Sequence, residues 1–158
     1  MNDLSAAPRA LERFIRERIP LARAIDVSVA AHDGAMLALD APLAPNVNDK
    51  GCAFGGSLVS VMTLAGWSLV ELALQARGID CDVYVGDSEV RYLVPVWSDF
   101  RAEARLDAGT DWDRFFATLA ERGKARAEVS CTVHEQGGAT VAATLRARFV
   151  AKRTPVPS

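Results

Sequence analysis

Residues 46–74 read NVNDKGCAFGGSLVSVMTLAGWSLVELAL, a polar loop that leads through a pair of glycines into a long apolar segment. Residues 58–74 are almost continuously apolar and compatible with a helix, which we expect to span about 55–76 and to be closed by Gly78. A helix that is apolar on every side is buried in a protein core or in a membrane. A helix that begins at glycine can also direct its first backbone N–H groups at a ligand carbonyl or anion.

The membrane alternative rests on residues 51–70, which carry no charge and have about the length of a bilayer span. The same segment contains four glycines and several hydroxyl residues, and strand-like segments flank it where interfacial anchors would be expected. We therefore predict a buried core helix and no membrane association.

The composition is that of an ordinary globular protein, with half of the residues hydrophobic and about a quarter charged. The formal net charge is −2, and basic residues are mixed with acidic ones, which argues against a nucleic-acid partner. The three cysteines lack the paired spacing of a metal site and suit the reduced thiols of a cytosol. No basic-then-apolar signal pattern opens the chain. We expect a cytoplasmic protein that uses neither a metal nor an organic cofactor.

Hydrophobic periodicity divides the rest of the chain into short elements. We expect an amphipathic helix over 8–18 that Pro20 stops, and a hairpin of 25–29 with 36–39 around Asp33-Gly34. Four strand-like segments follow the apolar helix: 82–95, 100–106, 125–134 and 143–151. Residues 111–122 fit either a helical insertion or a strand plus turn.

Alanine dominates the inward-facing positions of these strands. A sheet lined by small side chains leaves room for a thick object, and the apolar helix is the candidate in this chain. The pattern predicts an α+β fold in which a curved antiparallel sheet wraps around one long buried helix. We expect a single domain over residues 1–158, with 1–7 and 153–158 flexible.

Two motifs carry a resemblance to the hot-dog-fold thioesterases over roughly Ile19 to Val150. They are the loop Asn48-x-x-Gly51-x-x-Phe54-Gly55-Gly56 and a strand over 90–96 that ends with a proline. Residues 44–58 are more closely similar to the bacterial putative-thioesterase domain that occurs alone or fused behind an acetyltransferase, of which this chain shows no acetyltransferase half.

The chain departs from one branch of that family at two positions. The phenylacetyl-CoA-thioesterase-like branch has the loop Asn-x-x-Gly-x-x-His-Gly-Gly followed by a carboxylate on the helix. Phe54 stands at the position of the histidine here, and Thr63 at that of the carboxylate. The usual acid or base of the helix is therefore absent from both positions.

Thioester hydrolysis needs an oxyanion hole and a group that positions or deprotonates water. The N–H of Gly55 or Gly56 could supply the first, or the glycines could serve only close packing. Asp49 is the candidate base or water-orienting group, or it could pair with Lys50. Asn46 and Asn48 could bind the carbonyl or the water, or stabilise turns.

The remaining candidates line the start of the helix and would contact the substrate: Phe54, Gly56, Ser57, Ser60, Thr63 and Trp67. Hydroxyls in a helix more often bond back to the carbonyl four residues earlier. Cys52 could form a nucleophilic pair with His32 or His134, but neither histidine is close to it in sequence. The charged residues 87, 89 and 91 share one face of a strand, and we interpret them as structural.

The leading interpretation is hydrolysis of acyl thioesters of coenzyme A or acyl-carrier protein, the two partners that the resemblance implies. The resemblance also implies a homodimer, with possible assembly to a tetramer, and sites between the protomers. Decarboxylation of a malonyl thioester is an alternative, because it needs an oxyanion stabiliser and can dispense with a strong base. A second alternative is a hot-dog protein that binds acyl thioesters without catalysis.

Overall fold

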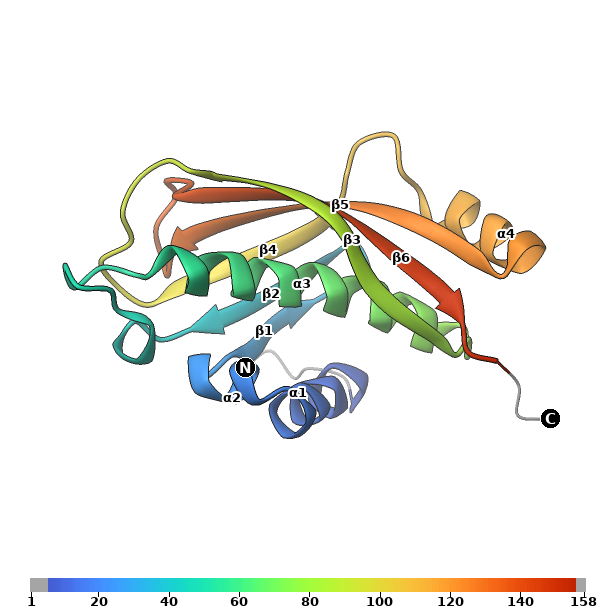
Figure 1. The fold of residues 1–158 in the computed structure, drawn as a ribbon, viewed down its shortest axis with the longest axis horizontal. Helices are drawn as coiled ribbons and strands as arrows, with labels where there is room; N and C mark the ends of the chain where they lie inside the picture. The colour runs from blue at the N-terminus through green and yellow to red at the C-terminus, as the bar shows by residue number, and fades with distance from the viewer. Residues whose placement is uncertain (1–5, 156–158) are drawn as a thin grey trace.

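One long helix, α3 (Gly55–Ala76), runs through the middle of the molecule, and a curved sheet wraps around it (Figure 1). The computed structural model describes residues 6–155. The other elements, in chain order, are α1 (Ala6–Arg18), α2 (Pro20–Ile25), β1 (Ser28–His32), β2 (Met36–Ala41), the 3-10 turn η1 (Ala44–Asn46), β3 (Cys81–Tyr92), β4 (Phe100–Leu106), α4 (Trp112–Arg122), β5 (Lys124–Glu135) and β6 (Ala143–Arg153).

The six strands form one antiparallel sheet in the order β1-β2-β4-β5-β6-β3. Helices α1 and α2 lie on the side of α3 that the sheet leaves open (Figure 1). The ring of Phe14 on α1 stacks on Trp67 of α3, with ring centroids 6.4 Å apart. The predicted α+β hot-dog architecture is therefore confirmed.

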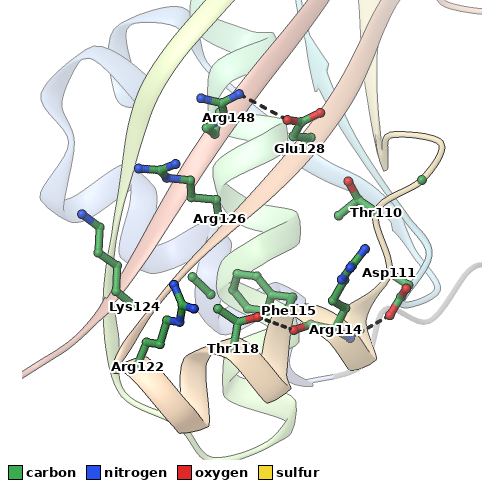
Figure 2. A pocket seen from close by; sticks show the side chains of 12 residues that line it. Thr110, Asp111, Arg114, Phe115, Thr118, Arg122, Lys124, Arg126, Glu128 and Arg148 are labelled. Atoms are coloured by element: carbon green, nitrogen blue, oxygen red, sulfur yellow. Dashed lines mark hydrogen bonds and ion pairs between the residues drawn. The ribbon is translucent and has the colours of Figure 1, made fainter.

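Residues 111–122, for which the sequence fits either a helical insertion or a strand plus turn, contain the helix α4. Asp111 caps it by accepting a hydrogen bond from the backbone N–H of Arg114 at 2.7 Å, and Gly123 ends it in the left-handed conformation with φ of 71°. The apolar side of α4 is buried through Phe115, Phe116 and Leu119. Its polar side borders a groove against the outer face of the sheet (Figure 2).

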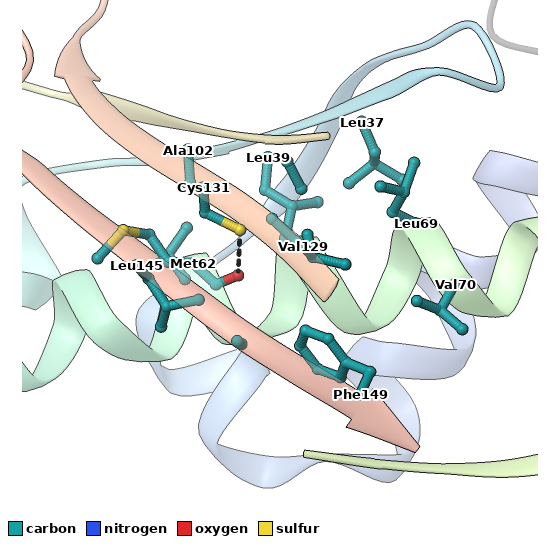
Figure 3. Packing of buried hydrophobic residues seen from close by; sticks show 14 of the residues in the cluster. Leu37, Leu39, Met62, Leu69, Val70, Ala102, Val129, Cys131, Leu145 and Phe149 are labelled. Carbon is teal, nitrogen blue, oxygen red and sulfur yellow. Dashed lines mark hydrogen bonds between the residues drawn. The ribbon is translucent and has the colours of Figure 1, made fainter. Parts of the chain in front are cut away.

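The inner face of the sheet is lined by small side chains, as the sequence predicts. The buried alanines of β4, β5 and β6 are Ala102, Ala104, Ala125, Ala127, Ala143, Ala147 and Ala151. A Cβ on Gly66 would lie 2.6 Å from the Phe149 ring, so glycine lets α3 approach β6 closely. The thiol of Cys131 donates to the carbonyl of Met62 at 3.4 Å, and burial raises its pKa to about 12 (Figure 3). This cysteine is a core residue.

The first strand of the hairpin begins later than the sequence predicts. Ile25 lies in α2, which starts at Pro20 because proline suits the first turn of a helix. Asp26 then adopts a left-handed conformation with φ of 58°, and extended structure starts at Ser28. The predicted end of the first helix before Pro20 is confirmed, because α1 ends at Arg18. The prediction of a strand from residue 25 was wrong, since the alternating apolar residues over 25–29 only imitate a strand at Ile25.

Two further predictions concern the ends of the chain and the membrane alternative for the apolar helix. Helix α1 begins at Ala6 and β6 continues to Arg153, while the predicted flexibility of residues 1–5 and 156–158 lies outside the described residues. Helix α3 is long and apolar enough to cross a membrane, yet half of its 22 residues are buried within the fold. Its hydrophobicity is that of a core helix.

Candidate active site

The start of α3 carries backbone N–H groups that have no acceptor among the described residues. Phe54 is the N-cap residue, and no side chain caps the helix. The Phe54 carbonyl accepts hydrogen bonds from Ser57 at 2.9 Å and Leu58 at 3.1 Å. Within residues 6–155, no acceptor is bound by the N–H of Gly55 or Gly56. The dipole of this 22-residue helix places roughly half a positive charge at that end, which favours a developing oxyanion.

Two aromatic rings frame these glycines. The Tyr92 hydroxyl donates to the Gly55 carbonyl at 3.3 Å, and a Cβ on Gly55 would lie 3.3 Å from the Tyr92 ring. A Cβ on Gly56 would overlap the ring of Phe54. Phe54 itself is largely exposed. The helix start is therefore a narrow polar spot between Tyr92 and Phe54.

Tyr92 lies against the candidate site but was not among the residues predicted from the sequence. It ends β3, 37 residues from Gly55 in the chain, and the two meet only because β3 runs beside α3. The available signal was the strand over 90–96, one of the two motifs shared with the thioesterases. That motif contains Tyr92 and therefore marks the strand end that approaches the glycine pair.

Asn48 organises the loop before the helix. Its Oδ1 accepts from the backbone N–H of Lys50 at 2.9 Å and of Cys52 at 3.2 Å, and its Nδ2 donates to the Cys52 sulfur at 3.2 Å. Gly51 makes the turn possible with φ of 88°. In this structure the Asn48 side chain is used to shape the loop that leads to Gly55.

Asn46 anchors the same loop from beneath and is only 1% exposed. Its Nδ2 donates to the carbonyls of Ile25 at 3.0 Å and Pro42 at 2.8 Å, and its own carbonyl accepts from the N–H of Phe54 at 2.7 Å. The Oδ1 atom is buried and has no partner among the described residues. Asn46 thus fixes the direction in which the chain enters α3, behind the open N–H groups.

Asp49 lies on the solvent side of the loop. Its two carboxylate oxygens are 3.0 and 3.2 Å from Lys50 Nζ, and the Asp49 side chain is 78% exposed. An exposed pair of neighbouring residues of this kind contributes little to stability. The carboxylate is therefore available to a ligand at small cost, although in the free chain it points into water.

The polar residues along α3 are engaged within the fold. Ser60 and Thr63 donate to the carbonyls of Gly56 at 2.8 Å and Val59 at 2.7 Å, the back-bonding that hydroxyls in helices commonly show. Ser57 is buried. Trp67 donates to the carbonyl of Val83 at 3.1 Å and so ties α3 to β3.

The cysteine alternative receives no support from the geometry. The Cys52 sulfur contacts Asn48, whereas His134 lies on β5 with its Nε2 3.3 Å from Glu103. Within residues 6–155, three or more His, Cys, Asp or Glu side chains nowhere gather as a metal site would require. The chemistry that the described residues offer is that of backbone N–H groups, one tyrosine hydroxyl and the loop carboxylate.

This fold is that of a hot-dog protein, and its candidate site is the start of the central helix. Residues 8–153 match the family described as "Putative thioesterase (yiiD_Cterm)", and the chain belongs to that family. The match covers every helix and strand from α1 to β6 apart from the first two residues of α1.

Solved structures agree with this assignment. A putative thioesterase from Shewanella oneidensis is 27% identical, with a TM-score of 0.83 and coverage of 96% of this chain and 100% of the other. A protein of unknown function from Chlorobaculum tepidum is 26% identical, with a TM-score of 0.86 and coverage of 93% and 94%. A Pseudomonas aeruginosa protein described as a probable thioesterase shares the fold at 24% identity, with a TM-score of 0.75 and coverage of 93% and 97%.

Proposed function

We propose that this protein hydrolyses acyl thioesters carried by coenzyme A or by acyl-carrier protein. The observation that carries the proposal is the uncapped start of α3, where the N–H groups of Gly55 and Gly56, beside Tyr92, bind no acceptor in the described part of the chain. Family membership supplies the reaction class, thioester hydrolysis. The glycines supply a place for the thioester oxygen, because a carbonyl can approach a backbone that lacks side chains.

In the proposed reaction the thioester carbonyl oxygen accepts a hydrogen bond from the Gly55 N–H. A water oxygen attacks the carbonyl carbon, and the oxyanion that forms is stabilised by that N–H and the helix dipole. The carbon–sulfur bond then breaks, and the sulfur leaves as a thiolate that takes up a proton. The products are a carboxylic acid and a free thiol.

We assign Asp49 to the attacking water and Asn48 to the loop that holds Asp49 in place. Asp49 accepts the proton of water after its carboxylate turns from Lys50, an exposed ion pair that costs little to break. Asn48 and the buried Asn46 hold the loop in place and thereby set the position of Asp49 relative to Gly55. The acyl chain runs along α3 past Phe54, Ser60, Thr63 and Trp67 in this proposal.

A homodimer through β3 is part of the proposal. β3 is a 12-residue edge strand whose one partner among residues 6–155 is β6, so within that range its other edge presents unpaired backbone groups. Large apolar side chains are exposed along it and just beyond it: Tyr84, Val85, Tyr92, Leu93 and Val94. Because Tyr92 touches Gly55, a second protomer at this edge lies beside the helix start and completes the site. Such a dimer can assemble further into a tetramer, and we place the enzyme in the cytoplasm.

One observation favours malonyl-thioester decarboxylation as the second candidate. A carboxylate aimed at the helix start would repel the carboxylate of a malonyl group, but Asp49 points into solvent and pairs with Lys50. The same N–H groups that stabilise a tetrahedral oxyanion could stabilise the enolate left by loss of carbon dioxide.

Separate measurements of free thiol and carbon dioxide distinguish these reactions. The protein is incubated with acyl-CoA, acyl-carrier protein and malonyl thioesters. Thiol without carbon dioxide supports hydrolysis, whereas carbon dioxide with an intact thioester supports decarboxylation. Binding without either product would identify a non-catalytic thioester-binding protein. Comparison of the hydrolysis rates for acyl-CoA and for acyl-carrier protein also shows which of the two carriers the protein accepts.

Variants assign the roles within the loop. Asp49→Asn should lower the hydrolysis rate about 100-fold, the usual contribution of a general base. Asp113→Asn is the matched control, because it removes one exposed carboxylate at the far end of the molecule. Equal rates for the two variants would remove Asp49 from the mechanism.

A further inference from the structure

A groove of about 540 Å³ lies between α4 and the outer face of the sheet, away from the proposed thioester site. One wall is the polar side of α4, where Arg114, Thr118 and Arg122 recur every four residues. The other wall is the sheet, with Lys124 and Arg126 of β5 and Arg148 of β6 (Figure 2). The groove is therefore concave and bordered by cations from three elements.

Most of these cations lack a counterion. Arg148 contacts Glu128 at 3.4 Å and Asp87 at 3.6 Å. Among residues 6–155, no ion pair or hydrogen bond engages the charged end of Arg114, Arg122, Lys124 or Arg126. The chain has more acidic than basic residues overall, 20 against 18, so this local excess is not a reflection of composition.

The acidic groups that line the groove are already used. Asp111 caps α4 by accepting from the N–H of Arg114 at 2.7 Å, and Glu128 pairs with Arg148. Nearby on the same outer face, Arg146 pairs with Asp107 at 2.6 Å. Among the described residues, the sheet thus neutralises Arg146 and Arg148 but leaves Lys124 and Arg126 unpaired next to α4.

The register of β5 and β6 gives an independent indication that the cations bordering the groove do not serve to stabilise the fold. Lys124 of β5 is directly opposite Lys152 of β6, and both side chains are exposed on the outer face. Like charges at directly opposed positions destabilise a sheet. Asp82 lies on the other side of Lys152 in the register, so Lys152 has a possible counterion there while Lys124 does not.

We propose that this groove binds a small ligand that carries phosphate groups and has the size of a nucleotide. The planar guanidinium groups of Arg114, Arg122 and Arg126 match the geometry of phosphate oxygens, and Lys124 adds a point charge. A concave volume of about 540 Å³ suits a small molecule, since ligand pockets span about 300–1,000 Å³. A flat acidic protein surface would not fill it.

The site is distinct from the thioester site of the same chain. Arg77, just after α3, lies 4.0 Å over the ring of Phe116 on α4, so the groove is near the C-terminal end of α3. Gly55 begins the opposite end of this 22-residue helix, roughly 33 Å away along its axis. The inference does not depend on the proposed hydrolysis.

Calorimetric titration of the whole protein with pyrophosphate and with adenosine 3′,5′-bisphosphate tests the proposal. We expect both to bind, with affinity that falls as salt is raised. Arg126→Gln should weaken binding about tenfold, the loss expected for one charge-assisted hydrogen bond. Arg13→Gln on α1 is the matched control, because it removes the same charge from an exposed site elsewhere and should bind as the wild type does.

Lys124→Gln separates a binding role from a structural one. It should weaken binding of both probes and yet raise the melting temperature, because it relieves the repulsion with Lys152. Absence of binding at millimolar concentrations would overturn the proposal, as would equal weakening in Arg13→Gln. Binding of an acidic carrier protein, but of neither probe, would also overturn it in favour of a protein-docking surface.

The kinetics of acyl-CoA hydrolysis identify the source of the phosphate. A raised KM in Arg126→Gln would assign the site to the nucleotide end of coenzyme A. An unchanged KM, with binding of the bisphosphate lost, would assign it to a free nucleotide. Either result supports a phosphate site in the groove.

Discussion

The two ends of α3 are built in opposite ways. At the C-terminal end, Gly78 donates to the carbonyl of Gln75 at 3.0 Å and Ile79 donates to that of Leu74 at 3.1 Å. At the N-terminal end, Phe54 offers no side-chain cap and the N–H groups of Gly55 and Gly56 are unbound among the described residues. The helix is therefore closed where only stability is at stake and open where a ligand can supply the missing acceptors.

Glycine marks both ends for different physical reasons. Gly78 has φ of 65°, a left-handed conformation that other residues adopt only with strain. Gly55 does not have a positive φ, and the absence of a side chain lets the Tyr92 ring lie close against it. A glycine at a helix end thus marks a backbone turn in one case and a close approach in the other.

We expect the largest loss of stability from a substitution of Asn46, which anchors the loop before the N-terminal end of α3. Asn46→Ala leaves the buried carbonyls of Ile25 and Pro42 without their donors and should lower the free energy of unfolding by about 2–4 kcal/mol. The melting temperature should fall by roughly 4–16 °C, as measured by calorimetry. Asn48→Ala, which alters a more exposed part of the same loop, should cost less. An equal or smaller loss in Asn46→Ala would contradict its role as the anchor.

A change at the closed end should affect stability alone. Gly78→Ala forces a side chain into the left-handed conformation and should cost about 1–2 kcal/mol. Space is available at this position, because an added Cβ would have no neighbour within 4 Å. Denaturant unfolding measures the loss, and thioester hydrolysis should keep its wild-type rate at temperatures where the variant is folded. Reduced hydrolysis by a fully folded variant would show that both ends serve the reaction.

The smallest effect is expected from Glu71, near the closed end. Burial raises the pKa of this carboxyl above its ordinary value of 4.5, so its charged form opposes folding at neutral pH. The contribution of this group to the free energy of unfolding of the wild type is fully present below the ordinary pKa. It is lost as the pH rises through the raised pKa. Glu71→Gln should therefore be more stable than the wild type at pH 8 and nearly equal to it at pH 4. Thermal melts at both pH values check the sign, and a variant stabilised equally at both would contradict it.

Most of the fold follows from patterns in the sequence. The span of α3 and the inward faces of β4, β5 and β6 were predicted because apolar runs and strict alternation depend on burial alone. The hairpin near Ile25 was misplaced since alternation over five residues occurs in both helices and strands, and only the packing of α2 decides between them. The sequence left residues 111–122, which contain α4, undecided between a helix and a strand plus turn for the same reason.

The sequence predicts where the candidate site lies, but it does not predict the contacts that each side chain makes there. The loop and the glycine pair indicated the start of α3, since those residues are contiguous. Tyr92 could not be placed from one sequence because its contact with Gly55 spans 37 residues. The amide groups of Asn46 and Asn48 fit binding or turn formation equally well in sequence, and the structure shows them engaged within the fold.

The central claim is that the Gly55 N–H stabilises the oxyanion, and a pair of variants at that residue tests it most directly. Proline is tolerated at the first position of a helix, and Phe54 has the extended conformation, φ −64° and ψ 133°, that a following proline requires. Gly55→Pro therefore removes the N–H, while Gly55→Ala keeps it; both add carbon against Tyr92.

The comparison is made on kcat/KM for acyl-thioester hydrolysis, with circular dichroism to show that both variants are folded. We predict that Gly55→Pro falls about 10²–10³-fold below Gly55→Ala, the usual cost of one oxyanion-hole donor. Equal activity in the two folded variants would contradict the account.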